Sequence, residues 1–195
     1  GHGRTGGQAG GNLGDINSFE SIVEDIYELA VKIKSEYDVP LFILGVDIGA
    51  LLGLHLSLLY SDIKIAGFIF LSPLWKFKET LKNIFKRPLL MLGQIYKKGE
   101  GILPVSLEPT EKTFFSEYIT YTKLDPMRLQ KTSIRFEKSL LSMVQGSSKY
   151  LKCTDRPVLI FQGTKDFLVD HFAIHNLYEK WGHSEKKIRF YENAG

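Results

Sequence analysis

One acidic residue stands in a sequence context in which a carboxylate could perform chemistry. Asp47 is the central residue of GVDIG at 45–49, with a glycine two positions before it and another two positions after it. Glycines at these positions let a strand and a helix pass close together, while the central residue takes a strained backbone angle that holds its side chain outward. The carboxylate of Asp47 could then act as a nucleophile, or it could simply cap the following helix.

The histidines and the glycine-rich start of the chain offer weaker candidates. His171 and His175 are four positions apart and could share a helix face as metal ligands, but no carboxylate or cysteine pattern completes a site, so we expect no metal. His55 falls on an apolar helix. Residues 1–14 contain a formal GxGxxG match without the preceding strand and following helix that a dinucleotide site needs, so we expect no cofactor of that kind.

Apolar runs on both sides of Asp47 predict the elements that position it. Residues 41–46 form a short continuous apolar run after Pro40, which is typical of a parallel strand covered on both faces. Residues 50–60 are apolar almost all round, as expected of a helix packed beneath other layers. The run from 40 to 60 is long enough to resemble a membrane span, but Asp47 near its middle and the strand-turn-helix division favour a soluble protein.

Strands and helices alternate along the rest of the chain. Three further apolar runs predict strands: 63–71, 158–162 and 187–191. Residues 19–33 have apolar side chains at helical spacing, which predicts an amphipathic helix with Asn17 as its N-cap. Residues 170–181 predict another helix, with Gly182 as its C-terminal glycine cap. This alternation predicts an α/β fold with a doubly wound, mostly parallel sheet.

Residues 74–150 differ from the rest and predict a helical cap insertion between two strands of the sheet, because prolines interrupt them and no strong strand run occurs. Their first part, 75–98, carries seven basic residues against one acidic residue, interleaved with large apolar side chains. That pattern suits a helix on an anionic membrane surface or at the entrance of a site for an apolar substrate. It equally suits a solvated basic face over a packed core.

The composition is that of an ordinary globular protein. The chain has 195 residues, of which 44% are hydrophobic and 24% charged, and this fits one domain with a sizeable core. A net charge of +3 is too small to argue for nucleic acid as a partner. The single cysteine rules out an internal disulfide, and no signal peptide is visible. We therefore expect a cytoplasmic protein that the basic insertion could bring to a membrane.

Four segments, in this order and at these spacings, resemble the α/β-hydrolase superfamily and within it the monoacylglycerol lipase and lysophospholipase branch of the serine aminopeptidase S33 type. GHGRTGG at 1–7 is similar to that branch's glycine loop, and GVDIG to its nucleophile elbow G-x-S-x-G. Asp125-Pro126 resembles a dipeptide of its lid, and GTKDFLVD at 163–170 the turn that bears its catalytic acid. The resemblance covers nearly the whole chain and implies a partial α/β-hydrolase fold.

The resemblance also implies roles for single residues. Asp47 occupies the position of the nucleophile, Asp166 that of the triad acid, and the backbone N–H of Ile48 that of one oxyanion donor. The family's catalytic histidine would follow directly after Gly195, and its early strands and second oxyanion donor would precede Gly1. We therefore expect a fragment cut at both ends that is inactive by itself. The resemblance implies a small lipid-like or apolar substrate and no cofactor.

Aspartate at the elbow changes the chemistry. A serine elbow forms an acyl-enzyme with an ester, whereas a carboxylate attacking an ester carbonyl would form a mixed anhydride. Attack on a saturated carbon that bears a halide or an epoxide oxygen gives an alkyl ester that activated water can cleave. Haloalkane dehalogenases and epoxide hydrolases resemble this elbow in using aspartate, although many of them place tryptophan where this sequence has Ile48.

Three hypotheses follow. The protein is a lipid-ester hydrolase that Asp47 impairs, an Asp-nucleophile epoxide or haloalkane hydrolase, or a catalytically silent protein whose basic insertion binds lipid or a membrane surface. Tyr96, Tyr118 and Tyr121 in the insertion could polarise an epoxide oxygen, but an aromatic content of 12% makes packing roles sufficient to explain them.

Overall fold

The computed structural model of this chain describes residues 13–76, 116–149, 151, 154–166 and 168–194, together with the backbone of 101–104. The chain forms two compact units. One comprises Gly1–Phe19 and Lys78–Ser142, and the other Glu20–Phe77 and Met143–Gly195. The candidate site lies in the second unit. The basic stretch at 75–98 falls almost entirely outside the described residues, as do residues 1–12, Tyr96 and Cys153.

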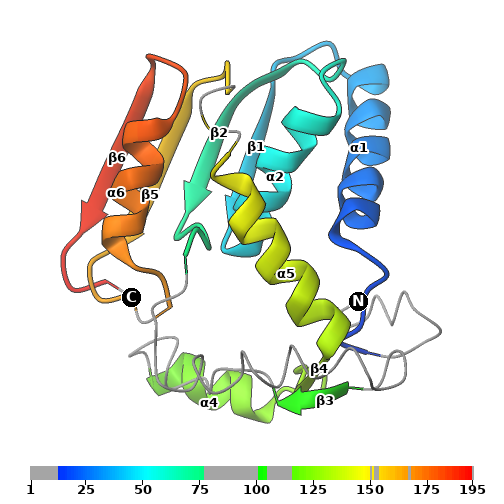
Figure 1. The fold of residues 1–195 in the computed structure, drawn as a ribbon, viewed down its shortest axis with the longest axis vertical. Coiled ribbons are helices and arrows are strands. Elements are labelled where there is room, and N and C mark those ends of the chain that lie inside the picture. Colours follow the sequence, from blue (N-terminus) through cyan, green and yellow to red (C-terminus); the bar gives the residue numbers. More distant parts are fainter. Residues whose placement is uncertain are drawn as a thin grey trace. The chain divides into compact units, whose positions relative to one another are not determined.

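The second unit is built on a parallel sheet of four strands in the order β1-β2-β5-β6 (Figure 1). These strands are β1 (Leu41–Val46), β2 (Ile65–Leu71), β5 (Val158–Gly163) and β6 (Lys186–Tyr191). Its helices are α1 (Phe19–Glu36), α2 (Ile48–Leu59), α6 (His171–Lys180) and the end of α5 (Ile134–Ser147). The predicted α/β fold with a mostly parallel sheet is confirmed, and the run from 40 to 60 divides into β1 and α2 as predicted.

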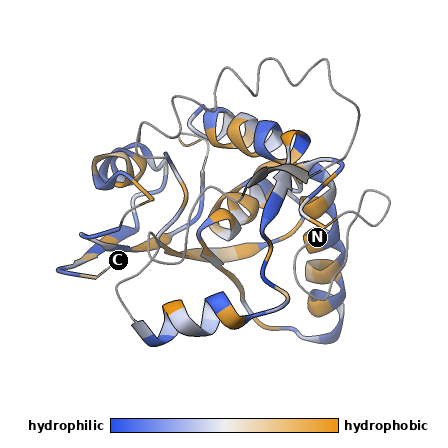
Figure 2. Cartoon of the chain, turned by 90° about the horizontal axis from the view of Figure 1, so that it is seen from below, coloured by the Kyte–Doolittle hydropathy of each residue, from blue (hydrophilic) through white to orange (hydrophobic). Residues whose placement is uncertain are grey.

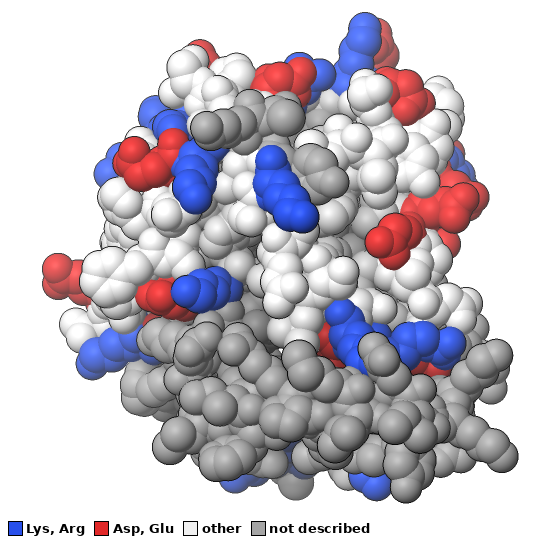
Figure 3. Space-filling model, viewed as in Figure 1, with Lys and Arg blue, Asp and Glu red and all other residues white. Residues whose placement is uncertain are grey.

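The core of this unit lies between the sheet and the helices α2 and α6. Phe70 of β2 packs near Gly53 of α2 and makes an edge contact with Trp181, which follows α6, with ring centroids 5.9 Å apart. Both helices therefore cover the same face of the sheet. Figure 2 shows that α2 and the central strands are hydrophobic along most of their length. Acidic and basic side chains are interspersed over the face drawn in Figure 3.

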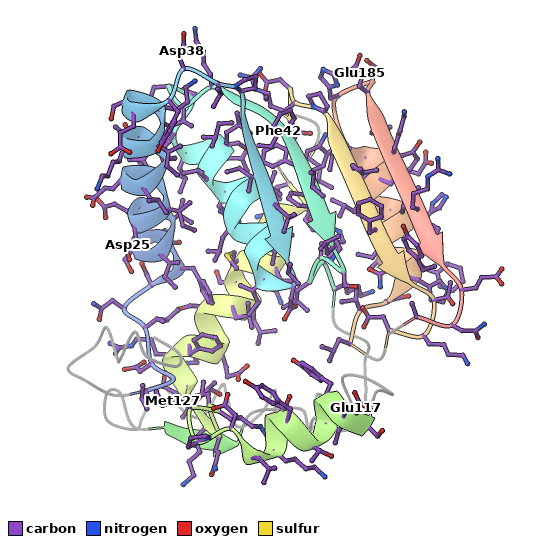
Figure 4. The ribbon with its side chains drawn as sticks, turned by 180° about the vertical axis from the view of Figure 1, so that it is seen from behind. Asp25, Asp38, Phe42, Glu117, Met127 and Glu185 are labelled. Atoms are coloured by element: carbon purple, nitrogen blue, oxygen red, sulfur yellow. The ribbon has the colours of Figure 1, made fainter. Side chains whose placement is uncertain are left out.

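The opposite face of β1 is exposed, which contradicts the expectation of a strand covered on both faces. Phe42, Leu44 and Val46 alternate along the strand and are 57%, 61% and 55% exposed. Figure 4 views the sheet from this side, with α2 and α6 behind the strands and Phe42 labelled. The prediction was wrong for the described residues because a continuous apolar run reveals how apolar a strand is, and not which helices lie over each face.

The first unit contains α4 (Ser116–Leu124) and a two-stranded antiparallel sheet of β3 (Gly101–Pro104) and β4 (Lys131–Ser133). The predicted helical insertion thus also contains two strands, which the sequence did not indicate because they are only a few residues long and carry no apolar run. α4 has no buried residues, and Tyr118 and Tyr121 are exposed, so the packing role expected of these two rings is wrong as well. After α4, the Asp125 side chain accepts a hydrogen bond from the Met127 backbone at 2.8 Å and closes a turn.

A buried ion pair joins distant parts of the first unit. Asp15 is buried and pairs with Arg135, and its Oδ1 accepts a hydrogen bond from the Ser133 hydroxyl at 2.5 Å. Burial by itself would raise the pKa of Asp15, but the hydrogen bonds from Arg135 and Ser133 outweigh it and hold that pKa below its usual value. The pair thus fixes the segment around Asp15 to β4 and the start of α5.

Candidate active site

Asp47 lies at a sharp bend between β1 and α2, as predicted. Its backbone has φ 53° and ψ −119°, a conformation that residues with a side chain rarely adopt. Gly45 makes the bend possible, because a Cβ atom at this position would lie 2.5 Å from Cα of Ala50. Gly49 is different, since a Cβ atom there would meet nothing within 4 Å. The expectation that both glycines serve the close approach was therefore wrong for Gly49.

Backbone hydrogen bonds fix this bend to the neighbouring strand. The N–H of Asp47 donates to the carbonyl oxygen of Leu71 at 3.1 Å. Its own carbonyl oxygen accepts from the N–H groups of Ala50 and Leu74, both at 3.2 Å. The Asp47 side chain makes no capping hydrogen bond to α2, so the alternative in which it simply caps the helix is wrong. The half-buried carboxylate is thus held at the bend by the backbone and takes no part in the helix cap.

Ile48 is the first residue of α2. The N–H groups at the start of an α-helix have no carbonyl partner within the helix. The N–H of Ile48 is such a group, and a group of this kind can donate a hydrogen bond to a developing negative charge. Its role as an oxyanion donor stays a prediction.

Asp166 is buried in the turn that follows β5, and its side chain accepts hydrogen bonds on both oxygens. Its Oδ1 accepts from the backbone N–H groups of Leu168 at 2.8 Å and Val169 at 3.0 Å. Its Oδ2 accepts from Nε2 of Gln162 at 2.9 Å. Sequence analysis missed Gln162. The available signal was a single amide side chain at the end of the apolar run VLIF, four residues before Asp166.

The turn that bears Asp166 is also tied to the turn after β6. The backbone N–H of Thr164 donates to Tyr191 at 3.0 Å, and that of Lys165 donates to Ala194 at 2.8 Å. The N–H of Asn193 donates in return to the Thr164 hydroxyl at 3.1 Å. The chain at Ala194 therefore lies beside the residue that precedes Asp166.

Asp47 and Asp166 lie at the same edge of the sheet. Each follows the carboxyl end of a parallel strand, and β2 separates β1 from β5. With about 4.8 Å between neighbouring strands, β1 and β5 are roughly 10 Å apart. Ser72 and Asn193, which follow β2 and β6, also have positive φ angles, of 43° and 62°. Backbone strain of this kind gathers at functional sites, and ligands of parallel sheets bind at this edge.

The described histidines do not join these carboxylates. Nε2 of His55 lies 2.9 Å from the Ser147 hydroxyl, and burial lowers the pKa of this histidine. The His171 ring is tilted by 31° against the Phe172 ring with centroids 4.6 Å apart, and Nε2 of His175 lies 4.0 Å from Glu179. Within the described part of the chain, no group of three or more His, Cys, Asp or Glu side chains is placed to hold a metal. Nor does any helix there have the length and apolar character to cross a membrane.

Comparison with solved structures shows similar folds. The monoacylglycerol lipase of Paleococcus ferrophilus superposes with a TM-score of 0.78 at 21% identity, over 91% of this chain and 66% of the lipase. A soluble variant of the monoglyceride lipase of Saccharomyces cerevisiae, solved with a substrate analog, gives 0.74 at 18% identity, over 90% of this chain and 60% of that one. A thermostable carboxyl esterase from Bacillus coagulans gives 0.71 at 14% identity, over 98% and 69%.

This chain therefore spans less than two thirds of each of the two lipases. No curated protein matches it in sequence. The family model described as "Serine aminopeptidase, S33" matches residues 1–195. The site agrees with this match: a strand, a strained bend and a helix meet at Asp47, and a second carboxylate lies at the same sheet edge. We conclude that the chain belongs to the serine aminopeptidase S33 family of α/β-hydrolases.

Proposed function

We propose that the chain forms part of a lipase- or esterase-type hydrolase in which Asp47 stands at the nucleophile position and weakens or abolishes ester turnover. One observation carries the proposal. Asp47 sits at the strained bend at the carboxyl edge of the sheet, and its side chain is not used to cap α2. The likeness to two monoacylglycerol lipases supports a small, lipid-like ester as the substrate class of the whole protein.

The chemistry explains the impairment. In our proposal the nucleophile at position 47 attacks the ester carbonyl, the N–H of Ile48 donates to the oxyanion, and Asp166 orients the general base. We propose that this base is a histidine of the whole protein. A carboxylate that attacks an ester makes a tetrahedral intermediate, which expels the carboxylate again more easily than it expels an alkoxide. The ester is then released unchanged.

The test uses the whole protein and a monoacylglycerol. Asp47→Ser supplies a nucleophile whose alcohol can be deprotonated and whose ester intermediate can be hydrolysed, so we expect kcat/KM to rise by at least about 100-fold over the Asp form. Asp47→Ala is the control and should stay at the level of the Asp form. An Asp47→Ser protein that folds normally and gains no ester hydrolysis contradicts the proposal.

The carboxylate at the elbow also favours a second candidate function, the hydrolysis of epoxides or haloalkanes. Attack of the Asp47 carboxylate on a saturated carbon forms an ester bond to the substrate and breaks its C–O or C–halogen bond. Water then cleaves the ester at the Asp47 carbonyl. Epoxide turnover by the natural Asp form that is lost in Asp47→Ser would favour this function and exclude the first. The absence of epoxide turnover in the Asp form would exclude the second.

We also propose a cytoplasmic location with peripheral membrane contact, and no nucleic-acid partner. The support is the sequence of 75–98, where seven basic residues alternate with large apolar ones. Membrane contact through 75–98 is also what the third hypothesis requires, in which the protein is catalytically silent and binds lipid or a membrane surface. We expect the whole protein to float with anionic liposomes at low salt, and a variant with Lys78, Lys82 and Lys86 changed to Glu to remain unbound. Equal flotation of both proteins would remove this support.

A further inference from the structure

We propose that Gln162 is a positioning residue that sets the orientation of the Asp166 carboxylate. Its catalytic consequence rests on the proposed function, whereas its geometry does not. Gln162 is the penultimate residue of β5, and its polar side chain is buried in a strand that is otherwise apolar. An amide in such a place requires a reason, because burial removes it from water.

The amide of Gln162 has only one orientation that suits its surroundings. Its Nε2 lies 2.9 Å from Oδ2 of Asp166 and 3.2 Å from the carbonyl oxygen of Gly163, and both of these atoms accept hydrogen bonds. The reverse orientation would set Oε1 against two acceptors. In the observed orientation, Oε1 is buried and has no hydrogen-bond partner in the part of the chain that the structure describes. The side chain thus makes the hydrogen bonds of its NH2 group and leaves the carbonyl oxygen Oε1 without one among the described residues.

Donors to the Asp166 carboxylate come from two different elements. The N–H groups of Leu168 and Val169 bind Oδ1 and belong to the turn itself. Gln162 donates to Oδ2, and it belongs to the strand. Donors on both oxygens prevent rotation about the Cβ–Cγ bond, whereas donors on one oxygen leave that rotation freer. Gln162, which is held in the sheet, therefore restricts rotation of the Asp166 carboxylate.

The first test measures this contact without any activity. In NMR spectra of the natural protein, the side-chain amide protons of Gln162 should exchange slowly and resonate downfield, because they donate to a carboxylate. Asp166→Ala should move this signal upfield and speed its exchange by about tenfold or more. Asp47→Ala, which changes a carboxylate two strands away, should leave the signal in place. An unchanged signal in Asp166→Ala would overturn the proposal.

The second test measures the consequence in the Asp47→Ser protein. Gln162→Leu and Gln162→Glu should lower kcat by roughly 10- to 100-fold and leave KM within about twofold, because a small misplacement of a catalytic group acts on the reaction step. Gln162→Asn, whose amide is one methylene short, should also lose activity. Ile160→Val is the matched control: it removes a methyl group from the same buried strand and should lower stability without lowering kcat.

The two tests separate the possible failures. If Asp47→Ser gains no esterase activity, the proposed function fails, and the NMR comparison still decides whether Gln162 holds Asp166. If Asp47→Ser is active and Gln162→Leu has the kcat of Ile160→Val, Gln162 is a structural residue only and the inference is wrong.

Discussion

The turns at Asp47 and Asp166 each follow a parallel strand at the same edge of the sheet, yet they hold their carboxylates by different means. Asp47 is fixed through its backbone, by hydrogen bonds to Leu71, Ala50 and Leu74, at a strained φ of 53°. Asp166 is fixed through its side chain, by donors on both carboxylate oxygens. The difference teaches that the first position depends above all on its backbone conformation, whereas the second requires a carboxylate.

The largest effect that this comparison predicts concerns the two glycines beside Asp47. Gly45→Ala places a Cβ atom 2.5 Å from the backbone of Ala50. We expect a loss of at least about 3 kcal/mol in the free energy of unfolding, because the strand and helix must move apart. Gly49→Ala meets no atom within 4 Å and lies in α2, so it should be neutral or stabilise by up to about 0.5 kcal/mol. Urea unfolding of both variants measures the difference, and equal losses would show that the close approach at Gly45 does not matter.

The next effect separates the two carboxylates directly. Asp166→Ala removes the acceptor of the hydrogen bonds from Gln162, Leu168 and Val169 and should cost roughly 2–3 kcal/mol. Asp47→Gly relieves the positive φ and removes no capping hydrogen bond from α2, so it should cost less stability than Asp166→Ala. The measurement is again the free energy of unfolding in urea. A substantial loss in Asp47→Gly would mean that the carboxylate at the bend carries stability and that the contrast between the turns is false.

The smallest effect depends on pH and concerns His55 of α2, the helix that begins at the bend, whose ring contacts the Ser147 hydroxyl. Burial lowers the pKa of His55 below 6.5, although the Glu20 charge and the Met143 carbonyl act in the opposite direction. The unfolded chain then binds more protons than the folded one, so stability should be full above about pH 6.5 and fall as the pH drops toward 5.

The comparison that isolates this term uses His55→Gln, which keeps an amide donor near the Ser147 hydroxyl. Thermal unfolding between pH 5 and 7 should show a flatter pH dependence for His55→Gln than for the natural protein. His171→Gln is the control, because His171 is an exposed residue at the start of α6, and it should retain the natural slope. A slope in His55→Gln equal to that of the control would exclude His55 as its source.

The sequence predicted the elements around Asp47 closely because each boundary has a local cause. Pro40 precedes the apolar run that becomes β1 and Gly45 lies near its end, and the strand has the bounds predicted for it. The bend at Asp47 follows from the tight contact that Gly45 permits. Local patterns of this kind are readable because they involve residues that are neighbours in the chain.

The parts that the sequence did not predict depend on partners that are distant in the chain. Gly182 does not act as a left-handed cap, because its N–H donates to the Leu151 carbonyl and the Thr154 hydroxyl, and α6 ends on an extended Trp181. The placement of Asp166 at the edge where Asp47 lies was expected only from the resemblance to the family, because it rests on the pairing of β5 with β2 across about ninety residues. The sequence did not reveal that Gln162 binds Asp166, since alternation along a strand indicates which side chains are buried but not which groups they bind.

The hydrogen bonds that join Thr164 and Lys165 to Tyr191, Asn193 and Ala194 have a practical consequence for anyone who engineers this molecule. These two turns lie fewer than thirty residues apart in the chain and hold each other through hydrogen bonds, so a library that randomises one turn alone will mostly disrupt these contacts. Residues 164–166 and 191–194 should be varied together, as a single cassette.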